Sequence, residues 1–419
     1  MNVLQPNKKP LKHLATINDN SLTENTDLER ELKYIDIGNV NSMGEINDIQ
    51  TYRFTDAPSR ARRIVADGDV IISTVRTYLQ AIAPIKSPPD NLIVSTGFAV
   101  IRPRLDQLDA DYCKYALREP EFLHEVVARS VGISYPAINT SDLGNIPIYI
   151  PPLSEQKAIA HYLDQEIAKI DELIKAKKRL LELLDEKRRA LITHAVTRGL
   201  NPDVPMRDSG VEWIGEIPKH WEVLRLRRVL KKMDYGISES VGIEGKIAVL
   251  RMGDIDEGEI NYDNVGFVED VDYDLILIKN DLLFNRTNSL DKIGKVAIFR
   301  DNFSFPVSFA SYLVRMRCND LVIPEYLNYL LNSLPILIWA QSQALPAIGQ
   351  VNLNPNRYSY VHIPIPPVEE QLIIIEYIKT KSEDIQTLFL LSEKTINLLQ
   401  ERRTSLITAA VTGQIKIKD

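Results

Sequence analysis

The chain has little of several features that mark particular protein classes. Only two of its 419 residues are cysteines, Cys113 and Cys318, too few for a disulfide framework or a thiolate metal site. No apolar run approaches the roughly 20 residues that a membrane-spanning helix requires. The first residues include two lysines but no apolar stretch behind them, so they do not resemble a secretory signal. These absences predict a cytoplasmic protein with no membrane partner.

Catalytic motifs are missing as well. No glycine-rich loop has the spacing of a P-loop, and no Asn-Pro-Pro-aromatic tetrad of the adenine-methyltransferase type is present. The six histidines are scattered, without an HExxH pair, and the carboxylates show no nuclease-like spacing. The sequence therefore predicts a non-catalytic chain with no catalytic residues, no metal and no cofactor of its own.

A basic excess is also missing. The net charge is −7 and the pI is near 5.6. Phosphate-binding proteins usually carry surplus Lys and Arg, so this balance argues mildly against nucleic acid as a partner. Charge can, however, be divided between a basic binding face and an acidic remainder, which leaves both classes of function open.

What the chain does have is one long segment present twice. Residues 150–197 and 365–412 align without a gap at an offset of 215, which places Gln156 on Gln371, and 19 of the 48 aligned positions are identical. In both segments apolar residues recur at steps of three and four, a heptad-like seam. Arg188 and Arg403 interrupt that seam at matching places. A continuous helix of some 40 residues would be roughly 60 Å long with one stripe to bury, so we expect the two helices to pack on each other.

The segments between these helices predict mixed domains. Short β-branched runs bounded by Gly, Pro and Asn are typical of strands, and each series ends in one amphipathic helical stretch. In the first unit the expected strands are 32–37, 68–75 and 91–104, with a helix at 109–130; in the second they are 246–255, 280–287, 294–299 and 308–318, with a helix at 325–343. The predicted fold class is α+β: two mixed α/β domains separated by two long helices packed as an antiparallel coiled coil.

The boundaries follow from this alternation. The predicted segments are a first domain at 1–149, a first long helix at 150–199, a connector at 200–223, a second domain at 224–362, and a second long helix with the C-terminal tail at 363–419.

Three motifs in order then resemble a known family. They are the connector TRGLNPDVPMRDSGVEWIGEIPKHWEV, the IPP-x-x-EQ entry to each long helix, and the LIT-x-AVT exits. Over nearly the whole chain they resemble specificity subunits of type I restriction–modification systems. The first domain departs from the pattern, because it lacks the Trp-containing entry of the second (Trp213, Trp221) and begins near Pro10.

The resemblance implies a function. Each target-recognition domain would recognise one half of a split site in double-stranded DNA, and the coiled coil would set the gap. The subunit would dock two methyltransferase (modification) subunits and, through them, endonuclease/translocase subunits. S-adenosylmethionine, ATP and Mg would be bound by those partners.

Candidate DNA-binding residues are polar and basic side chains that close or follow strands, because base edges in the major groove are read by such groups. In the first unit they are Arg60, Arg62, Arg63, Ser73, Thr74, Arg76, Thr77 and Tyr78; in the second they are Asn285, Arg286, Thr287, Asn288, Ser289, Lys292 and Lys295. Weaker candidates are Gln343, Gln350 and Asn352. Both clusters close a strand that begins with an Asp, at Asp69 and Asp281. The alternative is that these are ordinary solvated loop tips.

Other residues allow two interpretations. Candidate partner-docking residues are Glu155, Gln156, Glu370 and Gln371, although first-turn polar groups that fix the helix starts are the favoured interpretation. The Glu186/Arg188 and Glu401/Arg403 pairs could be solvated or part of a partner face. The YPAI and LPAI segments at 135–138 and 345–348 are interpreted as turns with Ile138 and Ile348 in the core. A coiled-coil scaffold whose globular units bind proteins is the alternative function.

Overall fold

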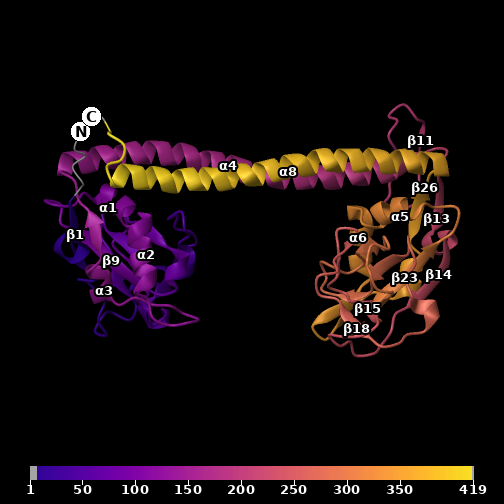
Figure 1. Ribbon diagram of the computed structural model, residues 1–419, viewed down its shortest axis with the longest axis horizontal. Coiled ribbons are helices and arrows are strands. Elements are labelled where there is room, and N and C mark those ends of the chain that lie inside the picture. Colours follow the sequence, from indigo (N-terminus) through magenta and orange to yellow (C-terminus); the bar gives the residue numbers. More distant parts are fainter. Residues whose placement is uncertain (1–6, 418–419) are drawn as a thin grey trace. The chain divides into compact units, whose positions relative to one another are not determined.

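The computed structural model describes residues 7–417 and divides the chain into two compact units. One unit is built from the chain up to Lys178 together with residues from Glu393 on, and the other from Arg179–Ser392. The division passes through both long helices, α4 (Leu153–Arg198) and α8 (Val368–Val411). Each unit therefore contains a globular domain and one end of each helix (Figure 1).

The first domain is built on two four-stranded sheets. The order of the first is β2-β9-β6-β7, all antiparallel: Ala15–Ile17, Phe98–Pro103, Val70–Ser73 and Ile82–Pro84. The order of the second is β4-β3-β8-β5, with β3 and β8 parallel: Gln50–Arg53, Glu31–Ile35, Leu92–Ser95 and Ala61–Ile64. A short pair, β1 (Lys8–Pro10) with β10 (Pro147–Tyr149), joins the two ends of the domain.

The helices of the first domain differ from the prediction in one respect. The expected helix at 109–130 is two helices, α1 (Ala110–Ala116) and α2 (Pro120–Ala128), followed by the short α3 (Thr140–Gly144). Pro120 has no N–H to continue the α1 ladder, and the Glu119 side chain accepts hydrogen bonds from the backbone at the start of α2. The expected strand at 91–104 is likewise β8 and β9, with a turn at 96–97 between them.

The second domain repeats this plan. Its antiparallel sheet has the order β14-β23-β19-β21: Leu230–Tyr235, Leu313–Cys318, Leu282–Asn285 and Val296–Ile298. Its other sheet has the order β18-β15-β22, with β15 and β22 parallel: Gly266–Val268, Ile247–Leu250 and Val307–Phe309. The closing pair is β13 (Glu222–Arg225) with β26 (His362–Ile365). The helices are α5 (Pro324–Leu331), α6 (Leu334–Gln343) and α7 (Pro355–Ser359). Pro335 breaks the expected helix at 325–343 as Pro120 breaks the other.

Smaller pairs complete the second unit. They are β11 (Met206–Asp208) with β12 (Glu216–Pro218) in the connector, β16 (Ile255–Asp256) with β17 (Glu259–Ile260), and β20 (Thr287–Asn288) with β25 (Gln350–Asn352) and β24 (Leu345–Ala347). Strand β20 follows β19 in the chain and contains Thr287 and Asn288 of the second candidate cluster. Strand β25 pairs with β20 on one side and with β24 on the other.

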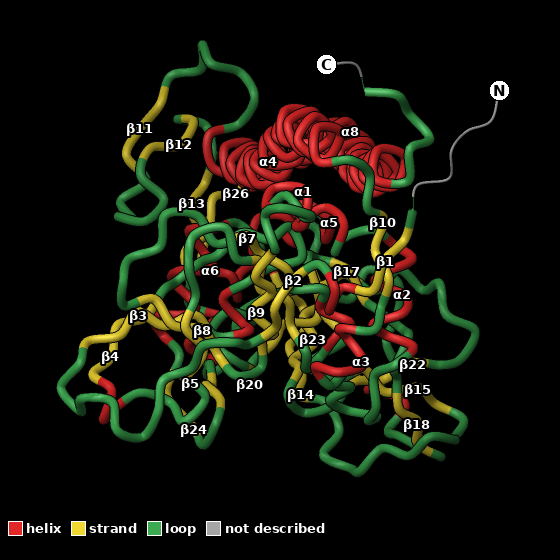
Figure 2. The backbone as a smooth tube through the Cα atoms, turned by 90° about the vertical axis from the view of Figure 1, so that its left-hand side faces the viewer, coloured by secondary structure: helices red, strands yellow, loops and turns green. Residues whose placement is uncertain are grey.

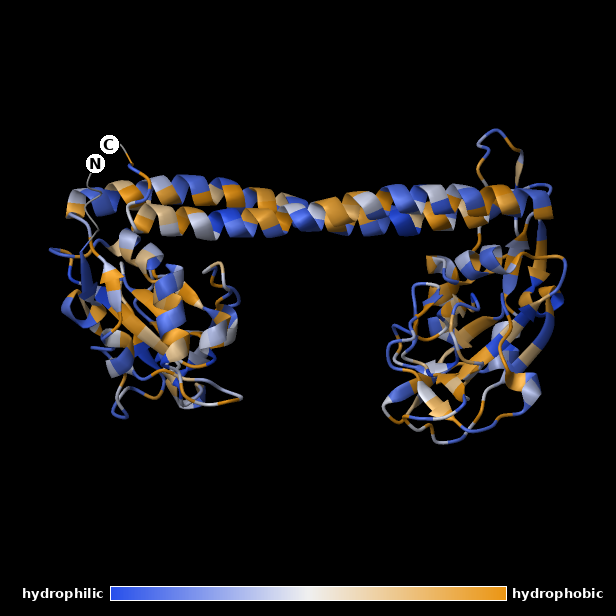
Figure 3. Ribbon diagram, in the orientation of Figure 1, coloured by the Kyte–Doolittle hydropathy of each residue, from blue (hydrophilic) through white to orange (hydrophobic). Residues whose placement is uncertain are grey.

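Packing of the helix pair confirms the predicted fold class. In the first unit, Ile159 and Leu163 of α4 share a core with Ile407 and Ala410 of α8. In the second unit the late α4 residues Ala195 and Val196 share a core with residues 374–378, at the start of α8. The beginning of each helix therefore packs against the end of the other, which is antiparallel. Figure 3 shows apolar and polar residues alternating along both helices, as expected for one buried seam.

Candidate nucleic-acid interface

In the first unit, Ser73 and the threonines at the end of β6 are satisfied within the protein. The Ser73 hydroxyl donates to the Val75 carbonyl, and the Thr74 hydroxyl donates to the Gly97 carbonyl at 2.9 Å. The buried Thr77 hydroxyl shares a hydrogen bond with Ser130 at 2.9 Å. These three side chains hold the loop in shape.

Arg76 and Tyr78 have a different environment in the same loop, because both side chains are exposed. Arg76 has φ +52°, in the left-handed region that L residues seldom adopt, and its guanidinium lies over the Tyr135 ring at 5.0 Å. Strained non-glycine residues of this kind cluster at functional loops. Tyr135 gave no signal in the sequence beyond being aromatic, and the structure shows that it supports Arg76.

Of the three arginines of β5 and its approach, Arg60 lies at the 95–97 turn, whereas Arg62 and Arg63 make contacts elsewhere. The Thr96 amide donates to the Arg60 carbonyl at 2.8 Å, and the Thr74 amide donates to the Gly97 carbonyl at 2.8 Å. Arg62 lies over the Phe54 ring at 4.7 Å, and Arg63 donates to the Ser21 hydroxyl at 3.3 Å. The 95–97 turn thus has Arg60 on one side and Thr74 on the other. The structure therefore brings Arg60 and Thr74 to the same turn, although they are 14 residues apart in the sequence.

In the second unit the polar candidates at the end of β19 are mostly buried. The Asn285 and Asn288 amides both donate to the Met252 carbonyl, at 2.8 and 3.1 Å. The Thr287 hydroxyl donates to Asn352 Oδ1 at 2.6 Å. These contacts tie three separate loops together. These side chains are buried and hold the domain's own structure together. The sequence pattern alone could not distinguish such buried polar residues from exposed ones.

The remaining second-unit candidates lie nearer the surface. Arg286 lies over the Tyr235 ring at 5.3 Å and donates to the Ser311 carbonyl at 3.3 Å. Ser289 and Lys292 are exposed, and Lys295 pairs with Asp256 at 3.1 Å. The weaker candidates also gather here: Asn352 and Gln350 lie on β25 beside β20, and Gln343 ends α6. Gln350 contacts the Met252 sulfur at 3.8 Å.

The candidate arginines differ from many others in the chain in having no carboxylate partner among the described residues. Many of the chain's arginines are engaged by a carboxylate, but within residues 7–417 Arg60, Arg62, Arg63, Arg76 and Arg286 are in no ion pair. Burial lowers the pKa of Arg63. Two of these arginines, Arg76 and Arg286, follow the central strands β6 and β19 and are cations without a carboxylate partner in that range.

The aspartates that open both central strands have a structural explanation. Arg102 of β9 donates to both carboxylate oxygens of Asp69, at 2.9 and 2.7 Å. Arg317 of β23 does the same to Asp281, at 2.7 and 2.8 Å. Both aspartates are 1% exposed. A buried bidentate pair at the same place in each domain fixes the central strand against its neighbour.

The glutamines at the helix entries make matching hydrogen bonds. Gln156 accepts from the Asp109 amide at 2.8 Å and donates to the carbonyls of Gln107 and Pro151, at 2.9 and 2.8 Å. Gln371 accepts from the Ile323 amide at 2.7 Å and donates to the carbonyls of Leu321 and Pro366, at 3.0 and 2.9 Å. Both are fully buried, and each ties a long helix to the loop before α1 or α5.

The neighbouring glutamates differ between the units. Glu370 accepts from the Trp221 indole at 3.0 Å and pairs with His220 at 2.8 Å, which secures the connector in the second unit. Glu155 is exposed. The difference follows from the first domain's lack of a Trp-containing entry.

The seam arginines reach into the domains. Arg188 pairs with Glu257 at 2.8 Å, in the β16–β17 hairpin. Arg403 pairs with Asp171 at 3.1 Å and donates to the Met43 carbonyl at 3.4 Å. Arg118 donates to that same carbonyl at 3.1 Å, and burial lowers the pKa of Arg118 to about 10. Both seam arginines therefore bind their own unit's domain to the helix pair.

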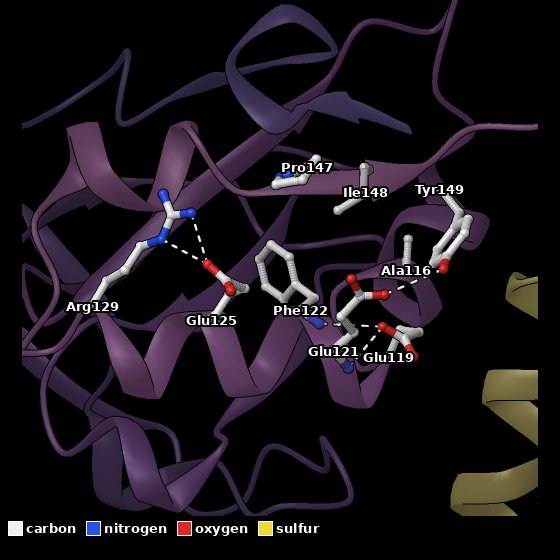
Figure 4. A pocket seen from close by; sticks show the side chains of 9 residues that line it. All are labelled: Ala116, Glu119, Glu121, Phe122, Glu125, Arg129, Pro147, Ile148 and Tyr149. Carbon is white, nitrogen blue, oxygen red and sulfur yellow. Dashed lines mark hydrogen bonds and ion pairs between the residues drawn. The ribbon is translucent and has the colours of Figure 1, made fainter. Parts of the chain in front are cut away.

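One surface hollow, beside α2, is rich in carboxylates, but they are engaged (Figure 4). Glu125 pairs with Arg129 at 2.7 Å, and Glu121 accepts from Lys8 at 2.6 Å, which lowers the pKa of that carboxyl. Glu119 caps α2. Within residues 7–417 no three His, Cys, Asp or Glu side chains are grouped so that they could hold a metal ion. No helix in that range is long and apolar enough to cross a membrane.

Interpretation of the two PAI segments is wrong in part. Ile138 is buried, as expected, but Ile348 is 105% exposed at the turn between β24 and β25. The equivalence of the two segments suggested by their sequences is also wrong. The N-cap residues of α3 and α7 are Asn139 and Asn354, which are related by the same offset of 215 as the long helices.

Comparison with known proteins agrees with this architecture. The family model described as type I restriction modification DNA specificity domain matches residues 7–183. A protein of Methanocaldococcus jannaschii, provisionally named the MjaX type I restriction enzyme specificity subunit, is 32% identical over 164 residues, which are 38% of this chain and 38% of that protein. The MjaVIII specificity subunit of the same organism is 24% identical over 335 residues, 78% of this chain and 75% of that one. The match thus spans well under half of MjaX and three quarters of MjaVIII.

Solved structures show the same fold. A chain from a structure concerned with complex assembly and conformational transition of the type I R-M system superposes with a TM-score of 0.79 at 20% identity, covering 98% of this chain and 99% of that one. The HsdS subunit from Thermoanaerobacter tengcongensis superposes with a TM-score of 0.56 at 20% identity, covering 98% of each. By the matching domain model and the named relatives, this chain is similar to type I restriction–modification specificity subunits, and the solved structures share its two-domain, two-helix fold.

Proposed function

We propose that this chain is the DNA-recognising, non-catalytic subunit of a type I restriction–modification complex. Each domain recognises one half of a bipartite double-stranded target, and the helix pair sets the gap between the halves. The observation that carries the proposal is the repeated design: in both domains uncompensated arginine charge lies where the central strand ends, at Arg76 and Arg286. Phosphate contacts there would position the protein, and a few base contacts would specify sequence.

Chemistry belongs to the partners in this proposal. Methyltransferase subunits would bind S-adenosylmethionine, and endonuclease/translocase subunits would use ATP and Mg. Docking would use the helix pair, because apolar side chains are exposed away from its seam: Leu372, Ile373, Leu388 and Leu390 of α8 are each more than half exposed. Exposed apolar rows of this kind favour protein interfaces. The exposed Glu155 is a further docking candidate, whereas the buried Gln156 and Gln371 would act through the helix starts that they fix.

The test is methylation mapping of DNA from cells that carry the complete system. The proposal predicts two short half-sites separated by a fixed gap of unspecified sequence. A second measurement separates it from a protein-binding scaffold: affinity for random duplex DNA, with and without a methyltransferase subunit, across a salt series. Phosphate binding predicts affinity that falls as salt rises. A scaffold predicts no DNA binding in either state.

A further inference from the structure

Both domains present a hairpin whose tip is a fully exposed isoleucine. Ile133 is 102% exposed and Ile348 is 105% exposed. Single exposed apolar residues are ordinary on protein surfaces, but each of these two has other exposed apolar residues beside it. Val131 and Tyr135 flank the first at 80% and 65% exposure, and Leu345 flanks the second at 61%.

The two hairpins are topologically equivalent. The first follows α2 and precedes α3, and the second follows α6 and precedes α7. In each, the outgoing arm pairs with the residues that follow the central strand: Ala137 with Val75, and Val351 with Asn288. Ile133 and Ile348 are also related by the offset of 215 that relates the long helices. The loops around them differ in sequence, yet the exposed isoleucine is present in both.

Glycine keeps each tip tight. Gly132 has φ +114° and Gly349 has φ +71°, so a left-handed residue stands directly before one isoleucine and directly after the other. The β24–β25 hairpin lies at the end of the second unit remote from α4 and α8, as Figure 2 shows. Each tip is therefore a tight turn from which an apolar side chain projects.

Unpaired arginines on the segments that pair with the hairpins indicate an anionic partner. Arg76 lies over Tyr135 in the first hairpin, and Arg286 directly precedes β20, which pairs with the second hairpin. Neither arginine is in an ion pair with a carboxylate within the described residues. The Arg286 side chain lies against Tyr235 and Ser311, so within that part of the chain a guanidinium contacts the hairpin itself only in the first unit. Apolar tips on hairpins that pair with segments carrying unpaired arginines fit duplex DNA, whose phosphates take the cations and whose stacked bases take the apolar tip.

We propose that Ile133 and Ile348 are wedges that enter the duplex between base pairs, one in each half-site, and partly unstack the step they enter. The proposal rests on the proposed DNA-recognising function. Apolar side chains in other DNA-binding proteins act in this way, and the unstacking cost depends on the sequence of the step. The wedges would therefore add specificity at positions where no polar side chain touches a base.

The test uses the complex of the full chain with its methyltransferase subunits and a duplex that carries the target found by methylation mapping. Each position in turn is replaced by 2-aminopurine, whose fluorescence rises when it is unstacked. We expect one bright position per half-site that dims in Ile133→Ala and another that dims in Ile348→Ala. A base turned out for methylation also brightens, but that signal would not depend on either isoleucine. Val131→Ala is the matched control, an exposed apolar residue beside the first tip.

A mismatch supplies the decisive comparison. Ile348→Ala should weaken binding to the matched duplex about tenfold, and a mismatch at the bright step should restore most of it, because the step is then already unstacked. Equal weakening on matched and mismatched duplexes would overturn the wedge. Loss of methyltransferase binding with unchanged base stacking would overturn it in favour of a protein interface. If the unaltered complex bound no target at all, the proposed function itself would fail, which is a distinguishable result.

Discussion

Replacing Gln371 by leucine should destabilise the second unit selectively. The Gln371 amide makes three hydrogen bonds of 2.7 to 3.0 Å and is fully buried. Leucine keeps the approximate shape but leaves the Ile323 amide without an acceptor and two carbonyls without this donor. At roughly 1 kcal/mol for each bond the loss is about 3 kcal/mol.

Scanning calorimetry of the full chain measures the effect. For a unit of roughly 200 residues, each kcal/mol shifts Tm by about 2–4 °C, so the transition of the second unit should fall by about 6–12 °C. Gln156→Leu should lower the transition of the first unit by a similar amount, which assigns the two transitions. Hydrogen exchange at the Ile323 amide should accelerate in Gln371→Leu.

The control for this experiment is Glu369→Ala, because Glu369 is exposed on the same first turn of α8. It should leave both transitions within about 1 °C, as surface substitutions usually do. If Gln371→Leu destabilised the chain no more than Glu369→Ala, the glutamine would not fix the helix start, and the reasoning would be refuted.

The other predictions concern charged groups. Asp281→Asn should cost about 3 kcal/mol in urea denaturation, because it breaks a pair whose carboxylate is 1% exposed and leaves the Arg317 charge uncompensated; a cost below about 1 kcal/mol would contradict this. Arg403→Ala should destabilise the first unit by about 1–3 kcal/mol, because it removes a mostly buried pair with Asp171. Arg188→Ala removes the more exposed pair with Glu257 and should cost under about 1 kcal/mol. A larger loss of stability for Arg188→Ala than for Arg403→Ala would contradict this reasoning. Arg286→Ala should relax one half-site only in methylation mapping, and uniform weakening on all DNA would instead mark a phosphate contact.

The long helices could be predicted from the sequence because helix periodicity and the repeat are local signals. The seam positions Ile159, Ile174, Leu184, Ile378 and Ile396 are buried as the heptad-like pattern indicated. The two helices of each domain were merged in the prediction, since apolar spacing continued across Pro120 and Pro335. The helices are separate because each proline lacks the N–H that would continue the helical hydrogen-bond ladder.

The candidate site was less predictable, because exposure depends on tertiary contacts. Asn285, Thr287 and Asn288 have the composition of a DNA-facing loop, yet contacts with Met252 and Asn352 bury them. The reverse happened at Ile348, an apolar residue expected in the core and found at a hairpin tip. The error arose because the two PAI segments are related by an offset of 210, whereas the long helices are related by 215. At the offset of 215, Ile348 aligns with Ile133 and not with Ile138.

The most direct test of the account is to lengthen the helix pair. One heptad inserted after Lys178 in α4 and one after Ser392 in α8 would add about 10 Å at ~1.5 Å per residue. At ~3.4 Å per base pair this corresponds to about three base pairs. Methylation mapping in cells that carry the lengthened chain should show both half-sites unchanged and the gap longer by about three base pairs. An unchanged gap, or altered half-site sequences, would contradict the claim that the domains recognise the sequence and the helices set the spacing.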